Sequence, residues 1–146
     1  ESKEIIENYY KSYPKLKDFT QDQIEFAREN GYVKTILGRK RYLNDINSRN
    51  AILRSSAERN AINTPVQGSA ADIIKIAMVK INNEFQNQSI KSKLILQVHD
   101  ELIFDCLKDE LNIVKEIISS SMQSAYKLKV PLKVDIGLGN NWLEAH

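Results

Sequence analysis

The sequence predicts an α+β fold in which antiparallel strands pack with several α-helices. Two observations predict it: apolar residues recur at helical spacing in several stretches, and short runs rich in β-branched residues lie between them, bounded by turn residues. The chain has 146 residues, which is long enough for one domain with a sizeable core. We therefore expect one compact unit over residues 1–146.

Two helices are expected before residue 31. The first carries an apolar stripe at helical spacing, made of Ile5, Ile6, Tyr9 and Tyr10. The second runs from about Lys15 or Lys17 to Asn30, and Gly31 is placed to end it in a left-handed conformation. We expect the apolar residues of both helices, including Phe19, to belong to the core.

A basic hairpin is expected next. Residues 32–37 form the first strand, Gly38-Arg39-Lys40 turns the chain, and residues 41–43 return as the second. Between residues 31 and 60 the chain has only two acidic residues against seven basic ones, which are Lys34, Arg39, Lys40, Arg41, Arg49, Arg54 and Arg59. This patch could face phosphates, and a solvated face remains the alternative.

Three more helices are predicted, the first from its capping and breaking residues and the other two from apolar stripes. One runs from an N-cap at Ser48 to Asn63 and is broken by Thr64-Pro65. The next continues to about Gln86, and the last spans about residues 108–126. Near the end of the chain, residues 131–137 alternate as an edge strand, and Trp142 is expected to pack back onto the protein.

A second hairpin carries the most suggestive side chains. Residues 93–105 hold two apolar, strand-length runs with His99-Asp100-Glu101 between them. Buried strands beside an acidic tip would hold a carboxylate rigidly where a cation could bind. When this stretch is taken alone, an ordinary polar turn is the better explanation of these three residues.

Composition excludes several classes of protein. The hydrophobic fraction of 42% and charged fraction of 27% are those of a soluble globular protein, and the net charge is only +2. The single cysteine, Cys106, excludes an intramolecular disulfide. No run reaches the roughly 18 apolar residues of a membrane span, and no signal peptide is visible. We expect a cytoplasmic protein without membrane partners, and the start at Glu1 suggests a piece of a longer chain.

Three stretches together resemble the C-terminal part of the family A DNA polymerases of bacteria. They are residues 38–50 (GRKRYLNDINSRN), residues 57–72 (AERNAINTPVQGSAAD) and residues 97–101 (QVHDE). Their order and spacing match the family, and the resemblance covers nearly the whole chain. It implies a partial palm domain whose hairpin bears Gln97 to Glu101, belonging to an enzyme that adds deoxynucleotides to a primer 3′ end.

The resemblance also implies roles for the turn residues. The family's palm holds two Mg²⁺ ions with aspartates from two motifs, and Asp100 matches the later one. Glu101 would lie beside the metals as an accessory carboxylate, and His99 and Gln97 would lie near the primer terminus. Asp100, Glu101 and His99 are thus the expected catalytic residues, with Asp100 as the metal ligand.

Further residues match positions that contact DNA. Arg59, Asn63 and Gln67 correspond to contacts with the template–primer duplex, and Arg41 lies in a segment that also approaches DNA. Amide side chains suit the minor groove because its acceptor pattern is nearly the same for every base pair. Arginine suits bidentate contacts with phosphate.

Parts of the family's site have no match in this sequence. Neither the first metal-binding aspartate nor the fingers helix that binds the incoming nucleotide is found, and both would precede Glu1. We therefore expect the chain to act within a longer, nucleoid-associated polymerase whose other half it needs in cis, and to be inactive alone with weak Mg²⁺ binding.

Two alternatives come from other classes. A non-catalytic nucleic-acid-binding module would share the basic patch but would not need Asp100, which repels phosphate when no metal is bound. A metal phosphohydrolase built on a His-Asp pair would need several histidines, and the chain has only His146 besides His99.

Overall fold

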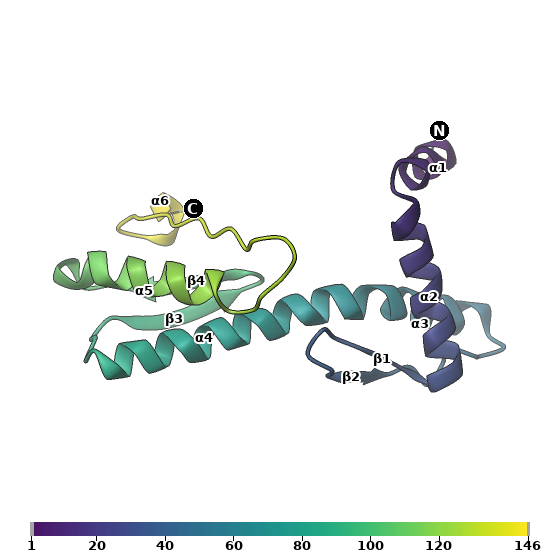
Figure 1. Ribbon diagram of the computed structural model, residues 1–146, viewed down its shortest axis with the longest axis horizontal. Coiled ribbons are helices and arrows are strands. Elements are labelled where there is room, and N and C mark those ends of the chain that lie inside the picture. The colour runs from purple at the N-terminus through teal and green to yellow at the C-terminus, as the bar shows by residue number, and fades with distance from the viewer. Residues whose placement is uncertain (1, 146) are drawn as a thin grey trace. The chain divides into compact units, whose positions relative to one another are not determined.

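The computed structural model describes residues 2–145, so His146 and the first residue of the predicted domain lie outside it. Helices and two small antiparallel sheets make up the chain, which confirms the predicted α+β class (Figure 1). The chain forms two compact units rather than the expected one, with the boundary between Ser69 and Ala70. Each unit buries its own apolar cluster. The hydrophobic pattern of the sequence shows which residues are buried, but not that they form two separate clusters.

Within residues 2–69, the first unit contains four helical segments and one sheet. Its elements are α1 (Ser2–Ser12), α2 (Pro14–Asn30), β1 (Tyr32–Lys34), β2 (Lys40–Tyr42), α3 (Ala51–Asn63) and the π-helix η1 (Thr64–Gly68). Its core consists of Ala27, Val33, Leu43, Ile46, Ala57 and Ala61. Gly31 ends α2 at a φ of 75°, as predicted, and its amide donates to the Ala27 carbonyl at 2.8 Å.

The apolar stripe of the first helix is not core. Ile5, Ile6 and Tyr9 expose 63, 55 and 52% of their surface. Helical spacing of apolar residues correctly predicted the helix, but it does not say whether another element covers its apolar face. Tyr9 instead contacts Tyr13, with ring centroids 5.1 Å apart.

Helix α3 starts later than predicted. Asn50, not Ser48, is its N-cap, and the Asn50 side chain accepts a 2.9 Å hydrogen bond from the Ile52 amide. The Ser48 hydroxyl accepts from the Asn50 amide at 3.2 Å and so supports the turn before the helix. Two residues with capping side chains lie two positions apart, and local sequence does not choose between them.

The predicted break at Thr64-Pro65 is also wrong. Helical structure continues from α3 through η1 into the next helix. Proline lacks an amide hydrogen and its ring crowds the carbonyl four residues earlier. The wider π-turn accommodates Pro65 at the start of η1 without ending the helix.

The second unit surrounds one apolar cluster. Its elements are α4, which begins at the boundary (Ser69–Asn87), β3 (Lys93–Val98), β4 (Glu101–Asp105), the 3₁₀ turn η2 (Lys108–Glu110), α5 (Leu111–Gln123) and α6 (Trp142–Ala145). Helices α4 and α5 bury Ile81, Phe85, Val114, Ile117 and Ile118, and the hairpin packs Leu102 and Phe104 against them. The predicted hairpin is confirmed, with a bulge between Leu94 and Leu96.

The C-terminal segment differs from its prediction. Residues 131–137 form no strand. The two sheets in residues 2–145 contain only β1 with β2 and β3 with β4, and none of these strands includes this segment. Alternating hydrophobicity predicts a strand only where a partner backbone is available, and Pro131 also lacks a donor. Trp142 is 48% exposed in the short helix α6 and does not pack back as expected. None of the helices in residues 2–145 has the length and apolar character needed to cross a membrane.

Candidate metal-binding turn and nucleic-acid interface

A two-residue turn carries the predicted metal ligand. His99 and Asp100 connect β3 to β4, and Val98 pairs with Glu101 across the hairpin. His99 has a φ of 53°, in the left-handed region that tight hairpin turns require. The Gln97 side-chain amide donates to the His99 carbonyl at 3.2 Å. The turn is therefore held from within the hairpin.

The tip is exposed while its base is anchored. Gln97, His99 and Asp100 are exposed, and Glu101 is half-buried. Along β4, Leu102 and Phe104 pack on the core, and the Phe104 ring lies 6.0 Å from that of Phe85. A rigid base beneath an accessible carboxylate is the arrangement that a cation site needs.

The donor chemistry of the turn fits one part of a magnesium site. Asp100 offers carboxylate oxygens, which Mg²⁺ prefers, and the adjacent Glu101 offers more. Among residues 2–145, no three acidic, histidine or cysteine side chains come together as a complete metal-binding group. The turn therefore supplies an incomplete ligand set, in which Asp100 is the accessible member.

A second carboxylate fixes the start of this hairpin. Glu110 accepts hydrogen bonds from the Lys91 amide at 2.9 Å, the Ser92 amide at 2.8 Å and the Ser92 hydroxyl at 2.6 Å. The bond from the Ser92 hydroxyl, followed by that from the Lys91 amide, lowers the pKa of Glu110 below its ordinary value. The same hydroxyl accepts from the Leu107 amide at 3.0 Å, so this clasp ties both ends of the hairpin together.

The predicted duplex contacts lie in the first unit. Arg59 and Asn63 are four residues apart on α3, and Gln67 lies in η1; all three side chains are exposed. The buried residues Ala57 and Ala61 alternate with them and face the core. The structure therefore presents these three side chains to solvent, in a different unit from the Asp100 turn.

The β1–β2 hairpin holds the π-helix. Arg41, which is exposed, donates from Nη1 to the hydroxyl of buried Thr64 at 3.2 Å. Arg39 donates from Nη2 to the Gly68 carbonyl at 3.2 Å. At the end of η1, the Ser69 hydroxyl donates to the Pro65 carbonyl.

Close packing accompanies these hydrogen bonds. The Ile36 amide donates to the Ser69 hydroxyl oxygen at 2.8 Å. A Cβ at Gly68 would come within 2.8 Å of the Cγ2 of Thr35, which is buried. Sequence reasoning missed Thr35, Gly68 and Ser69, because their roles depend on contacts across about 30 residues of chain. Pro65 within a helical stretch was the available signal.

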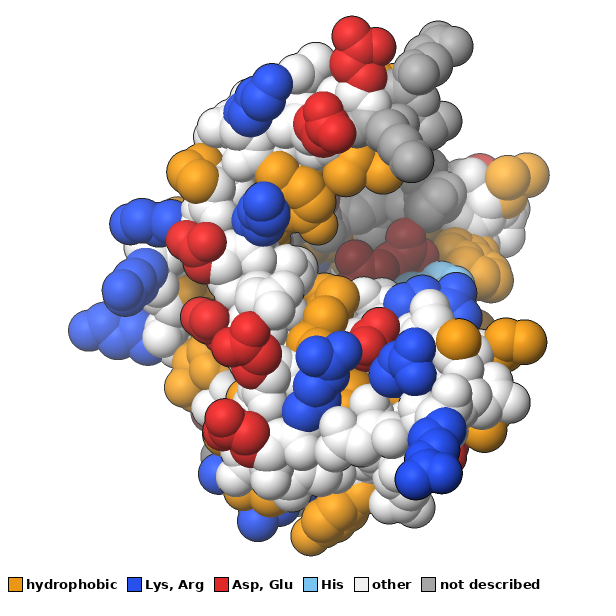
Figure 2. Space-filling model, turned by 90° about the vertical axis from the view of Figure 1, so that its right-hand side faces the viewer, with side chains coloured by type: hydrophobic (Ala, Val, Ile, Leu, Met, Phe, Trp, Pro, Cys, Tyr) orange, Lys and Arg blue, Asp and Glu red, His pale blue; other side chains and the backbone are white. Residues whose placement is uncertain are grey.

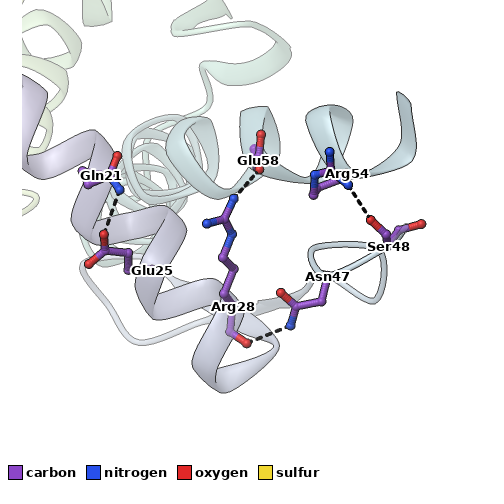
Figure 3. A network of polar contacts seen from close by, with 7 residues as sticks. All are labelled: Gln21, Glu25, Arg28, Asn47, Ser48, Arg54 and Glu58. Carbon is purple, nitrogen blue, oxygen red and sulfur yellow. Dashed lines mark hydrogen bonds and ion pairs between the residues drawn. The ribbon is translucent and has the colours of Figure 1, made fainter. Parts of the chain in front are cut away.

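A polar network sets α2 against α3 (Figure 3). Arg28 forms a 2.7 Å ion pair with Glu58, and its carbonyl accepts from the Asn47 side chain at 3.0 Å. Arg54 donates to the Ser48 carbonyl at 2.9 Å. Arg54 was counted in the basic patch, but the structure uses it to hold the turn before α3.

Comparison with known proteins identifies the family. The model of DNA polymerase family A matches residues 1–144. The chain belongs to DNA polymerase family A. DNA polymerase I of Borreliella burgdorferi is 51% identical over 146 residues, and that of Caldicellulosiruptor bescii is 49% identical over 144 residues. The chain covers 16% and 17% of these two relatives, respectively.

A solved structure of the family has the same fold. It is described as the POL domain of Pol1 from M. smegmatis in complex with DNA primer-template and dNTP. The TM-score is 0.93 at 41% identity, and the match covers 96% of this family A chain and 25% of the other. The predicted membership of family A is confirmed, as is the expectation of a partial polymerase fold.

Proposed function

We propose that residues 1–146 are the C-terminal part of the polymerase domain of a template-directed DNA polymerase. The longer enzyme adds deoxynucleotides to a primer 3′ end by two-metal phosphoryl transfer. The exposed Asp100 at a turn whose base is packed on the core carries this proposal. The bacterial relatives support a cytoplasmic, nucleoid-associated location.

The turn residues have distinct roles. Asp100 would hold Mg²⁺ through its carboxylate, and Glu101 would lie beside it as an accessory carboxylate. When bound, two Mg²⁺ ions stabilise the charge on the attacking 3′-oxygen and on the leaving pyrophosphate. His99 and Gln97 lie against the primer terminus, and the hydrogen bond from Gln97 to the His99 carbonyl keeps the turn in one conformation.

The first unit binds the template–primer duplex. Asn63 and Gln67 contact the minor groove, where a polymerase needs sequence-independent hydrogen bonds. Arg59 and Arg41 contact phosphates, so binding weakens as salt rises. Both units belong to one polypeptide, and the deoxynucleoside triphosphate is bound by the rest of the enzyme.

A chimera tests the proposal. This chain replaces the matching segment of the Borreliella polymerase I, and primer extension is measured with Mg²⁺ and four nucleotides. We expect the chimera to extend a primer and Asp100→Asn to reduce the rate by more than roughly 100-fold, because losing only the partner of a metal ligand costs 10–100-fold. Asp105→Asn, at the other end of β4, is the matched control and should keep full activity. Equal rates for the two variants would refute the role of Asp100.

The isolated chain provides the complementary measurement. Half of a metal site should give no primer extension, and calorimetry should show only weak Mg²⁺ binding. A non-catalytic binding module is the alternative function, and it predicts a chimera without activity. It also predicts that Asp100→Ala raises the isolated chain's duplex affinity equally with and without Mg²⁺.

A further inference from the structure

One face of the β1–β2 hairpin combines aromatic rings with lysines. In the antiparallel register Tyr32 is opposite Tyr42, and Lys34 is opposite Lys40. Residues two apart in a strand project to the same side, so these two pairs lie next to each other. Val33, between them in β1, is fully buried on the other side. We call the four residues Tyr32, Tyr42, Lys34 and Lys40 the Tyr–Lys face.

The rings form a continuous cluster with one exposed end. The ring of Tyr32 lies 5.7 Å from that of Phe26 and 5.9 Å from that of Tyr42, measured between centroids. Tyr42 is 68% exposed, whereas Tyr32 is half-buried. The cluster fixes the exposed Tyr42 ring from behind and leaves its surface open to solvent.

The two lysines are arranged for an anion. Like charges directly opposite each other in an antiparallel pair repel. Lys40 Nζ lies 4.2 Å and Lys34 Nζ 5.4 Å from the centroid of the Tyr32 ring, which attracts both ammonium groups. Neither lysine forms an ion pair with a carboxylate within the described part of the chain. Figure 2 shows one face of the molecule, on which basic, acidic and exposed hydrophobic side chains are interspersed.

We propose that the Tyr–Lys face binds a single-stranded segment of nucleic acid. A base stacks on the Tyr42 ring, and Lys34 and Lys40 contact the flanking phosphates. An aromatic ring can stack only on a base whose face is open, which favours an unpaired strand over a duplex. The inference rests on the proposed polymerase function, in which the unpaired strand is the template.

Binding of an oligonucleotide to the whole chain tests the stacking. The probe is fluorescein-labelled oligothymidylate of roughly 12 nucleotides, a length within the usual site sizes for single strands. Tyr42→Ala should weaken binding by roughly 5- to 140-fold, because stacking of one base on a ring contributes about that much. Tyr42→Phe keeps the ring and should bind within twofold of the unaltered chain. An unchanged affinity for Tyr42→Ala would overturn the proposal.

The lysines have their own test. Affinity falls as salt rises, so this slope is negative. The double variant Lys34→Gln, Lys40→Gln should reduce the magnitude of the slope of log affinity against log salt by roughly 1.4, since each lost phosphate contact on a single strand removes about 0.7. Lys17→Gln, which removes an exposed lysine of α2, is the control and should leave the slope unchanged. A slope that is the same in the double variant would contradict the assignment of these lysines.

A fluorescent base separates stacking from loss of folding. An oligonucleotide containing 2-aminopurine should be quenched by the unaltered chain and by Tyr42→Phe, but not by Tyr42→Ala at saturating protein. Affinity for a fully paired duplex distinguishes this inference from the proposed function. Tyr42→Ala should leave duplex binding unchanged, whereas Arg59→Ala should weaken it. If Arg59→Ala did not weaken duplex binding, the proposed duplex contact of Arg59 would be refuted. The proposal for the Tyr–Lys face would be unaffected by that result.

Discussion

Arg41 donates a 3.2 Å hydrogen bond to the hydroxyl of Thr64, which joins strand β2 to the first residue of the π-helix. Thr64 is buried, whereas Arg41 is exposed. The guanidinium has five N–H donors, so this bond leaves others that can reach a phosphate. Arg41 thus holds the segment that presents Asn63 and Gln67, in addition to its proposed contact with DNA.

Removing the acceptor tests this link. Thr64→Val should lower the free energy of unfolding by about 0.5–1.5 kcal/mol, the net contribution of one hydrogen bond. It should also weaken duplex binding, because Asn63 and Gln67 flank the loosened turn. Urea unfolding and duplex titration are the two measurements. Thr20→Val, on α2, is the control and should leave duplex affinity unchanged; equal affinity for Thr64→Val would rule out the link.

The contact between Gly68 and Thr35 predicts a rescue. Gly68→Ala places a methyl group 2.8 Å from the Thr35 Cγ2, which is stiff and buried. Such overpacking should cost about 1–3 kcal/mol of stability. Thr35→Ser removes the methyl but keeps the hydroxyl that accepts from the Arg39 amide at 3.2 Å. The double variant should therefore be more stable than Gly68→Ala alone, and additive losses would show that the clash is elsewhere.

The two proposed kinds of duplex contact respond differently to salt. Arg59→Ala should reduce the slope of log affinity against log salt by about 0.9, the value for one phosphate contact on B-DNA. Arg59→Lys keeps the charge and should keep the slope. Asn63→Ala should weaken binding at every salt concentration without changing the slope, because its contact is uncharged. A lower slope for Asn63→Ala would mean that it acts through a charged neighbour.

Acid should weaken the clasp at Glu110. Because hydrogen bonds lower its pKa in the folded chain, the carboxylate stabilises the fold above its ordinary pKa of 4.5, and this contribution is lost as pH falls below that value. Glu110→Gln should be less stable near neutrality and should lose stability less steeply between neutrality and acid. Unfolding as a function of pH measures this, with Glu116→Gln on the exposed face of α5 as the control. Parallel curves for Glu110→Gln and the unaltered chain would contradict the assignment.

Local patterns predicted most of the fold where the relevant residues are contiguous. The hairpin at residues 93–105 needs two apolar runs and the turn between them, all within one short segment. The prediction of a strand at residues 131–137 was wrong, because alternation of apolar and polar residues does not show whether a partner backbone is present. The prediction that Ile5 and Ile6 belong to the core was wrong for a similar reason. Amphipathicity indicates which face of a helix is apolar, but not whether another element packs on that face.

The site was predicted by motif rather than by physics. A polar turn and a metal-binding turn look alike at His99-Asp100-Glu101 until the surrounding stretches are compared with a family. The sequence could not show that Arg54 holds a turn or that Arg41 bonds to Thr64, because both depend on tertiary contacts. The structure of each unit resolved these roles, whereas the metal and DNA contacts remain proposals.

At His99 the left-handed backbone conformation and the proposed function favour different residues. Glycine or asparagine adopts a φ of 53° at less cost than histidine. A library randomised at residue 99 and sorted for resistance to unfolding would therefore enrich those two residues, whereas sorting for DNA synthesis by the longer enzyme would retain the imidazole. Engineering this segment for greater stability would thus select against its proposed chemistry at the tip of the hairpin.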